Sequence, residues 1–433
     1  MNLHVFLKWS LCWGLLAAAG AGCVTGKQGR FERAEYRQPG FFPILPWDPY
    51  HGWGRPVIER GTNGLESVAR CNFNMAGFVL PRDLPQCEKL GLGAIMLTTD
   101  AAFTNVQYIY QWRTLSDAEI EGRVTTMIAA AGASPAVAGY FINDEPGLRD
   151  FPALAKAVAA VKKHAPGKLA YINLFPDYAT LGAPDTSQLG TSNYLEYLQR
   201  FVAEVKPQII SYDNYMVQYS LDLRDRGVAV SYYRNLLDVR RVALEHHLPY
   251  LNIVASNQLQ SDKTIPSPAN LLFQAYTTLA AGYRGVTWYT YYGDGYGYAP
   301  VTRGEKTPTW GMLQEVNRQV AALAPVMSRL TSTGVFFSAP APAENLPLLP
   351  GRLVHSVDCA NPVMVGEFEA QDGKRYAMVV NLSVERSAPF TLKTVRPLKV
   401  VSILWAEGTV VPFDAKTGLW LTAGQGVLLG LEE

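Results

Sequence analysis

The sequence predicts an α/β protein, a (β/α)8 TIM barrel followed by a C-terminal antiparallel β-sandwich. From residue 41 to residue 330, short apolar runs rich in β-branched and aromatic residues alternate with helical stretches, which is the pattern of βα units around a parallel sheet. Eight such runs occupy a length close to the ~250 residues of a typical barrel. From residue 331 to residue 433, proline-rich segments separate short alternating strands, as in a sandwich.

The positions of the barrel strands follow from these apolar runs. An open doubly wound sheet is the alternative fold, but no glycine-rich phosphate turn follows an early strand, and this favours the barrel. We expect the eight strands at Phe41–Asp48, Asn72–Val79, Ala94–Asp100, Gly139–Glu145, Leu169–Phe175, Ile209–Met216, Tyr250–Ala255 and Gly285–Tyr291.

Several helices between these strands carry start signals. Ser116 and Glu119 have the spacing of a capping box, in which each side chain bonds the backbone N–H of the other residue. Pro152 follows Asp150, and Pro268 follows a serine; proline is favoured in the first turn of a helix because that turn needs no N–H donor. We therefore expect helices to begin at these three places.

The C-terminal region shows the two-residue period of half-buried strands. Asp372 and Gly373 form a turn signal between two of these strands. The expected sandwich strands are Val363–Phe368, Tyr376–Asn381, Phe390–Leu392, Val400–Trp405 and Gly426–Leu431.

Residues 1–23 resemble a bacterial lipoprotein-type signal peptide. Lys8 precedes an apolar run, and small residues lead into Cys23. This run is shorter than the ~20 apolar residues that span a membrane. We expect export, a lipid anchor on Cys23 in a bacterial membrane (periplasmic or cell-surface), and a tether over residues 24–40; an ordinary secretory signal is the alternative.

The composition excludes several classes of function. Lys and Arg total 38 against 37 for Asp and Glu, giving a net charge of +1, so nothing predicts binding to nucleic acid. The six histidines show no metal-ligand spacing, and the sequence contains neither a phosphate loop nor a Gly-x-Ser-x-Gly elbow. We expect no cofactor and no metal, and the sequence leaves the oligomeric state open.

Polar and aromatic residues recur at the ends of the expected barrel strands. The carboxyl ends of barrel strands carry the active site, so these residues are candidates for ligand contacts. Each one alone has a structural explanation as a turn former, a helix cap or a core residue, but their recurrence favours a site. The candidates are Trp47, Asp48, Asn74, Asn173, Tyr212, Tyr215, Asn257, Trp288 and Tyr291.

The end of the fourth expected strand carries two adjacent carboxylates, Asp144 and Glu145, followed by Pro146. Like charges this close repel, so one of the two tends to keep a proton near neutral pH. A protonated carboxyl is what a general acid requires. The alternative is a pair of helix-capping residues.

This strand end resembles that of many (β/α)8 glycoside hydrolases, in which an Asn-Glu or Asp-Glu pair carries the acid/base glutamate. Glu145 matches that glutamate. The segments 274–282 and 288–291 resemble the seventh helix and eighth strand of such enzymes, and the sandwich resembles their accessory domains. The resemblance implies a carbohydrate substrate and hydrolysis of O-glycosidic bonds in an extracellular polysaccharide or glycan.

The identity of a second catalytic group stays open between two enzymatic mechanisms. The largest clan of these enzymes places a nucleophilic glutamate at the end of strand seven, but here residues 250–258 contain no carboxylate. In the first mechanism, Asp213 at the end of strand six is the nucleophile or the base. In the second, Asp144 and Glu145 resemble the pair of glycoside hydrolase families 20 and 123, where the acetamide of the substrate is the nucleophile. Tyr212 or Tyr215 would then hold the acetamide, and Trp288 would form the floor.

A binding protein is the third reading. The missing strand-seven glutamate also suits a non-catalytic carbohydrate-binding barrel, a degenerate glycosidase. The intact run from Asp144 to Pro146 opposes it.

Overall fold

The computed structural model describes residues 40–47, 64–220, 223–414, 416 and 418–433. The expected signal peptide, the tether up to residue 39 and Asp48 lie outside these residues. Within the described part of the chain, no helix is both long and apolar enough to cross a membrane.

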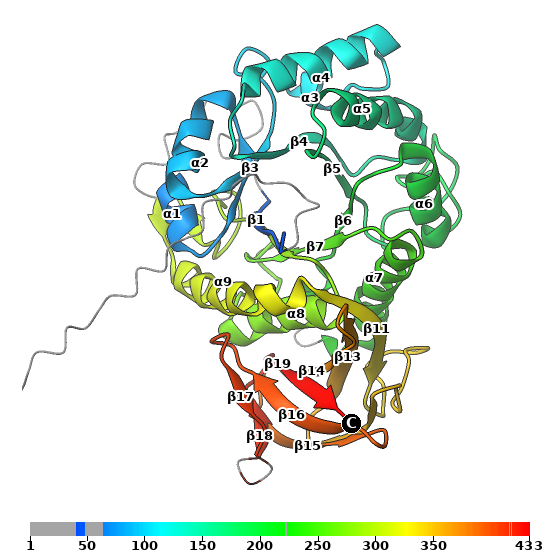
Figure 1. Cartoon of the computed structure of the whole chain (residues 1–433). Helices are drawn as coiled ribbons and strands as arrows, with labels where there is room; N and C mark the ends of the chain where they lie inside the picture. Colours follow the sequence, from blue (N-terminus) through cyan, green and yellow to red (C-terminus); the bar gives the residue numbers. More distant parts are fainter. Residues whose placement is uncertain (1–39, 48–63, 221–222, 415, 417) are drawn as a thin grey trace, which may run out of the picture.

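The expected barrel is confirmed (Figure 1). Eight parallel strands follow one another in hydrogen-bonded order from β1 through β8 to β2, and helices surround them. Each strand overlaps an expected one. The strands are β1 Ile44–Pro46, β2 Met75–Val79, β3 Gly93–Met96, β4 Val137–Asp144, β5 Leu169–Leu174, β6 Ile210–Asp213, β7 Tyr250–Ala255 and β8 Val286–Tyr289.

A side chain joins β1 to β2 at the amino end of the barrel. The Asn74 amide accepts a hydrogen bond from Ile44 N at 2.8 Å and donates one to Phe42 O at 2.8 Å. Asn74 precedes the first residue of β2, so it lies at the strand end opposite to the rim. The expectation that Asn74 binds a ligand is therefore corrected. β1 and β2 are the two ends of the hydrogen-bonded strand order and share no ladder, and the Asn74 amide supplies hydrogen bonds between them instead.

The three helix starts predicted from the sequence are confirmed. Ser116 and Glu119 form the capping box of α4, and Ser267 caps α8. Helix α5 begins at Phe151, with Pro152 in its first turn. The α-helices are α1 Leu65–Arg70, α2 Leu84–Leu90, α3 Val106–Tyr110, α4 Asp117–Ala131, α5 Phe151–His164, α6 Tyr194–Arg200, α7 Arg226–Glu245, α8 Pro268–Ala280 and α9 Pro308–Met327.

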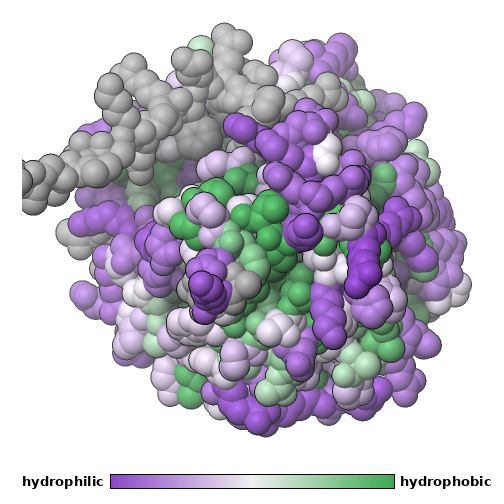
Figure 2. All heavy atoms as spheres, turned by 60° about the horizontal axis from the view of Figure 1, so that its bottom comes forward, coloured by the Kyte–Doolittle hydropathy of each residue, from purple (hydrophilic) through white to green (hydrophobic). Residues whose placement is uncertain are grey.

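Two apolar layers hold the barrel together. Side chains that point inward fill the barrel, and at its centre Trp47 packs against Phe78 and Tyr171, with ring centroids 4.5 and 5.2 Å apart. Side chains that point outward pack against the helices. Figure 2 shows hydrophilic residues over much of one face, with hydrophobic residues gathered towards its middle.

The C-terminal region forms the expected antiparallel sandwich. Its larger sheet has the order β11-β13-β14-β19-β16-β17, and its smaller sheet the order β12-β15-β18. The strands are β11 Leu330–Phe337, β12 Val354–Cys359, β13 Val363–Ala370, β14 Arg375–Asn381, β15 Ala388–Thr394, β16 Lys399–Leu404, β17 Val410–Pro412, β18 Leu419–Leu421 and β19 Gly426–Glu432.

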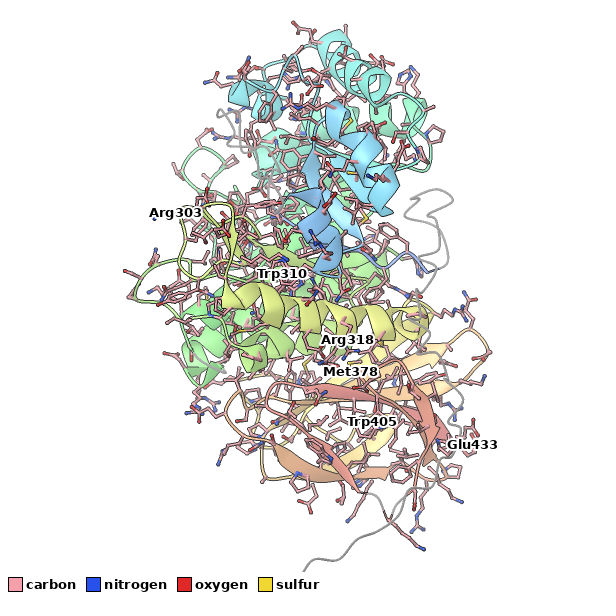
Figure 3. All side chains as sticks on the ribbon, turned by 90° about the vertical axis from the view of Figure 1, so that its left-hand side faces the viewer. Arg303, Trp310, Arg318, Met378, Trp405 and Glu433 are labelled. Carbon is pink, nitrogen blue, oxygen red and sulfur yellow. The ribbon has the colours of Figure 1, made fainter. Side chains whose placement is uncertain are left out.

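Helix α8 contacts the larger sheet of the sandwich at β13, β14 and β19. The approach is so close that a Cβ atom at Gly366 would lie 2.0 Å from Ala280 O, and one at Gly424 would lie 2.1 Å from Ala269 O. Figure 3 shows α9, with Trp310 and Arg318, between the barrel and the sandwich. The two regions are thus packed directly against each other.

Candidate active site

The carboxyl ends of β4, β5 and β6 bring three carboxyl groups together. Asp144 is the last residue of β4, and Glu145 has a left-handed backbone with φ +49°. Successive residues of a regular strand point to opposite faces, but the strand has ended before Glu145. Both side chains therefore lie beside Asp213, the last residue of β6.

The turn after Glu145 is fixed by neighbouring elements. The Glu145 N–H donates to Asn173 O on β5 at 2.9 Å. The hydroxyl of Tyr197 on α6 donates to Pro146 O at 2.7 Å. These two bonds hold Glu145 itself and the residue that follows it, so the left-handed conformation of Glu145 is imposed by its surroundings.

Asn173 is the centre of the site. Its Nδ2 atom donates to Asp144 Oδ1 at 3.1 Å and to Asp213 Oδ1 at 2.9 Å. Its Oδ1 atom accepts from Ser211 Oγ at 3.1 Å, and that hydroxyl lies 3.0 Å from the hydroxyl of Tyr171. One amide thus sets the spacing of two carboxyl groups, and the barrel interior in turn orients the amide.

Asp213 is a direct neighbour of Glu145, because a side-chain hydrogen bond with Asp213 is among the causes that act on the pKa of Glu145. Burial raises the pKa of Asp213 well above its usual range, and the charges of Glu145 and Asp144 raise it further. Burial also raises the pKa of Glu145, while the hydrogen bond from Asp213 opposes that rise. Two carboxyls in contact cannot both ionise at low cost, so they share one proton.

Asp144 adds a third acidic group. Burial raises its pKa to about 7, with a further contribution from Glu145 and an opposing one from the Asn173 hydrogen bond. Among the described residues, no lysine or arginine contributes to the pKa shifts of these three carboxyls. Among the described residues, no set of His, Cys, Asp or Glu side chains is arranged to hold a metal ion. The arrangement suits proton transfer.

Two partly exposed tyrosines flank the carboxyl groups, and the sequence analysis did not select them. Tyr110 is 36% exposed and Tyr178 is 41% exposed. Desolvation raises the pKa of the Tyr110 hydroxyl, and the charges of Asp144 and Glu145 add to this. Desolvation likewise raises the pKa of Tyr178, with added contributions from Asp213 and Glu145. Both hydroxyls therefore lie beside the acidic cluster and near solvent.

A tyrosine stack forms another side of the site. The Tyr215 ring lies 5.5 Å from the ring of Tyr289, and the Tyr289 hydroxyl lies 2.5 Å from that of Tyr296. The Tyr215 N–H donates to Tyr178 Oη at 3.2 Å. Tyr215 was an expected site residue and lies in the site, whereas Tyr289 was missed.

Three aromatic residues that we expected to contact the ligand do not reach the site, so this expectation is corrected. Tyr212 and Trp288 are fully buried in the layer between sheet and helices. The Tyr212 hydroxyl meets Tyr283, and Trp288 Nε1 donates to Asn317 on α9. Tyr291 follows β8, and its hydroxyl accepts from Trp310 Nε1 at 2.8 Å. The alternation of side chains along a strand places the first two on the outer face.

The remaining expected residues lie in different environments. Trp47 is 3% exposed and packs inside the barrel, so it supports the site from below. Asn257 lies just beyond β7, is fully buried, and among the described residues its side-chain amide has no hydrogen-bond partner. Asp48 lies outside the described residues. Asn173 is in the site, as expected.

The fold of the barrel and the sandwich is shared with solved structures of glycosidases. The structure resembles a catalytic mutant of a GH42 β-galactosidase from G. stearothermophilus, with a TM-score of 0.60, 9% identity, and coverage of 92% of this chain and 99% of that chain. It also resembles a cold-adapted β-galactosidase from Rahnella sp. R3, with a TM-score of 0.50, 12% identity, and coverage of 69% of this chain and 58% of that chain. At these identities the likeness shows the fold alone.

The sequence itself matches no protein-family model and no curated protein. The two similar structures do not bear on the expected likeness to glycoside hydrolase families 20 and 123, which stays a prediction.

Proposed function

We propose that the protein is a glycosidase that hydrolyses O-glycosidic bonds in an extracellular polysaccharide or glycan, with Glu145 as its general acid. The shared proton of Glu145 and Asp213 carries this proposal, because it keeps an acid available at the rim of a glycosidase-like barrel. Export and lipid attachment at Cys23 belong to the same proposal. They would place the barrel where such glycans occur.

The contact between Glu145 and Asp213 bears on the mechanism. Two carboxyls that act on opposite sides of a glycosidic bond stand ~5–5.5 Å apart in retaining enzymes and ~6.5–9.5 Å apart in inverting ones. A hydrogen-bonded pair leaves no room for an anomeric carbon between its members. We therefore assign Asp213 as the proton-sharing partner of Glu145 and not as the nucleophile.

A substrate with an N-acetyl group then supplies the missing nucleophile. Its acetamide oxygen attacks the anomeric carbon as the glycosidic C–O bond breaks, and Glu145 gives its proton to the leaving oxygen. Asp144, which is partly exposed, accepts the acetamide N–H and so orients the group. Water then attacks the anomeric carbon of the cyclic intermediate and restores the acetamide, while the Glu145 carboxylate takes the proton of that water.

The tyrosines around the cluster suit a sugar ring. Tyr110 and Tyr178 offer hydroxyls and ring surface at the solvent side, and Tyr215 stacks with Tyr289. Sugars have apolar faces that pack on aromatic rings, and their hydroxyls take hydrogen bonds from phenols. Among the described residues no lysine or arginine acts on the three carboxyls, and the negative charge of this cluster favours a neutral sugar over an acidic one at this position.

The test is hydrolysis of a panel of aryl glycosides, with N-acetylhexosaminides included, by the wild type and by Glu145→Gln. We expect turnover of an N-acetylhexosaminide that falls by ~10²–10⁴-fold in the variant. The loss should be smaller for a 2,4-dinitrophenyl leaving group, which needs little protonation. Glu66→Gln, which changes an exposed glutamate on α1, is the matched control and should keep full activity.

Other outcomes of the same panel would change the proposal. Turnover confined to glycosides without an acetamide would return Asp213 to the role of nucleophile or base. Absence of turnover in the wild type, with equal glycan binding by wild type and Glu145→Gln, would overturn the hydrolase proposal and leave a carbohydrate-binding barrel.

A further inference from the structure

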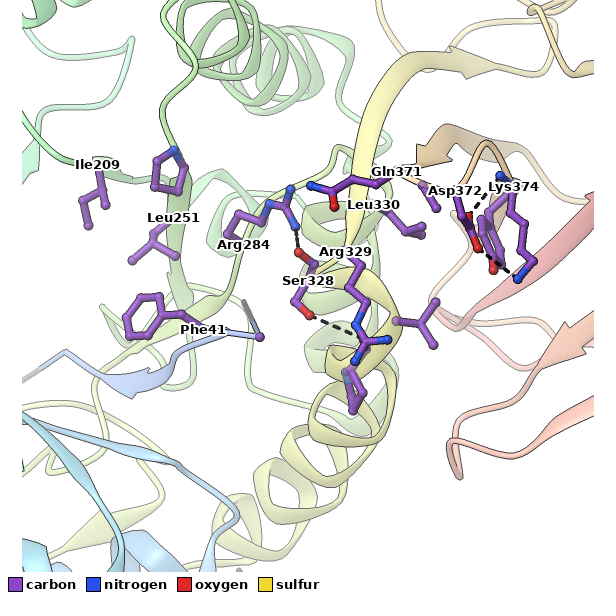
Figure 4. Close-up of a pocket in the computed structure, with 16 residues that line it drawn as sticks. Phe41, Ile209, Leu251, Arg284, Ser328, Arg329, Leu330, Gln371, Asp372 and Lys374 are labelled. Carbon is purple, nitrogen blue, oxygen red and sulfur yellow. Dashed lines mark hydrogen bonds and ion pairs between the residues drawn. The ribbon is translucent and has the colours of Figure 1, made fainter. Parts of the chain in front are cut away.

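A cavity lies at the end of the barrel opposite to the acidic cluster, next to the sandwich (Figure 4). Its volume is about 620 Å³, within the usual range of small-molecule sites. One wall consists of residues at the amino ends of barrel strands, among them Phe41, Ile209 and Leu251. Another wall comes from the hairpin between β13 and β14, which carries Gln371.

Arg284 is a partly buried cation of this cavity. Its Nη1 atom donates to the carbonyls of Met327 and Ser328 at the end of α9. None of the ion pairs found in the described residues includes Arg284. The hydrogen bonds that Arg284 forms with other described residues use its Nη1 atom alone. A partly buried guanidinium without a carboxylate partner is costly, and an anion that neutralises it is favoured.

The surroundings of Arg284 add charge of the same sign. Arg329 and Lys374 also line the cavity, and of its lining residues only Asp372 is acidic. Asp372 is bound to Lys374 at 2.9 Å, so it does not neutralise Arg284. In Figure 4 the side chains of Arg284 and Gln371 point towards one another across the cavity, and Phe41, Ile209 and Leu251 form a separate apolar group.

We propose that this cavity binds a small amphiphilic anion, whose carboxylate, sulfate or phosphate group pairs with Arg284 and whose apolar part packs on Phe41, Ile209 and Leu251. The guanidinium offers two free N–H directions, which match the two oxygens of such a group. The apolar wall supplies the rest of the binding free energy by removing a ring or a short chain from water. This site is separate from the acidic cluster and does not depend on the proposed glycosidase activity.

The experiment is calorimetric titration of the full chain with 4-phenylbutyrate, phenyl phosphate and phenyl sulfate, with the neutral 4-phenylbutan-1-ol as the matched ligand. We expect at least one anion to bind the wild type about ten-fold or more tightly than the alcohol does. Gln371→Glu places a carboxylate opposite Arg284 on an exposed hairpin and should abolish anion binding. Gln260→Glu, an exposed position after β7 at the other end of the barrel, should leave it unchanged.

Arg284→Gln should also abolish binding, but it removes two bonds to the end of α9, so Gln371→Glu is the decisive variant. Glu145→Gln should bind the anion as the wild type does, which separates this site from the acidic cluster. The proposal is overturned if no anion binds the wild type, if the alcohol binds equally well, or if Gln371→Glu keeps the wild-type affinity.

Discussion

Two regions of the molecule bury carboxyl groups in opposite ways. In the sandwich, Glu367 is fully buried and accepts hydrogen bonds from the backbone N–H groups of Arg352, Leu353 and Val354 at 3.0, 2.9 and 2.9 Å. In the barrel, Asp213 is 4% exposed, yet its neighbours are Asn173 and two other carboxyls. The first group has its charge satisfied by donors, whereas the second must share a proton.

This difference separates a structural carboxylate from a functional one. The loop from residue 351 to 354 is built around Glu367, since a Cβ atom at Gly351 would lie 2.3 Å from its Oε1 atom. That carboxylate replaces backbone partners that the loop lacks. Within the described part of the chain, the barrel cluster meets no comparable set of donors, and it is costly to bury in its charged form. A protein keeps such a cluster at a site of chemistry.

The largest effect on stability is expected at Glu367. Glu367→Ala leaves the N–H groups of Arg352, Leu353 and the buried Val354 without their acceptor. A buried unsatisfied donor costs ~1–3 kcal/mol, so with the lost packing of the side chain we expect the free energy of unfolding to fall by about 4 kcal/mol or more. Chemical denaturation measures this. Glu369→Ala, two residues along the same strand and exposed, is the control and should change little. A loss below about 1 kcal/mol in Glu367→Ala would remove the contrast between the two regions.

A smaller effect of opposite sign is expected at Asp144. Its pKa is about 7 in the folded protein against 3.8 for the ordinary group, so between these pH values the folded state holds a proton that the unfolded state has released. The free energy of unfolding therefore falls as pH rises from about 4 to about 7. Asp144→Asn removes this fall, and we expect it to stabilise the protein by roughly 2–4 kcal/mol at pH 8 and to have almost no effect at pH 3.

The measurement is urea denaturation of the wild type and Asp144→Asn at both pH values, with Asp185→Asn as an exposed control. Glycosidase activity should fall in Asp144→Asn while stability rises. Equal stability of the two proteins at pH 8 would mean that burying the charged Asp144 does not lower the free energy of unfolding. The contrast between the barrel carboxyls and Glu367 would then fail.

The sequence predicted the order of the barrel strands and the acidic pair, but not the face on which each rim residue points. Barrel strands are apolar on both faces, so alternation gives no sign of which residues point inward. For β8 this made Trp288 as plausible as Tyr289, and the structure places Trp288 against α9. For Asn74 the error was in the strand boundary, because an apparent strand of residues 72–79 begins only at Met75.

Some features of the site were readable from sequence and others needed long-range contacts. Pro146 indicated that β4 ends early, which is the condition for Asp144 and Glu145 to share one side. The contact of Glu145 with Asp213 joins residues on different strands, and no local pattern reports it. Tyr110 lies on the short helix α3, away from any strand end, so a search of strand ends missed it.

The smallest effect on stability is expected at Tyr178. A change at this residue should instead appear in substrate affinity. Its ring is partly exposed, and from the described residues its hydroxyl accepts one bond, from Tyr215 N at 3.2 Å. Tyr178→Phe should therefore lower the free energy of unfolding by less than about 1 kcal/mol.

If the hydroxyl also binds sugar, KM should rise several-fold with a smaller change in kcat, because a bond made equally in ground state and transition state acts on binding. Tyr219→Phe, another exposed tyrosine, is the control. An unchanged KM in Tyr178→Phe, or a loss of stability like that of Glu367→Ala, would assign Tyr178 to the scaffold instead of the site.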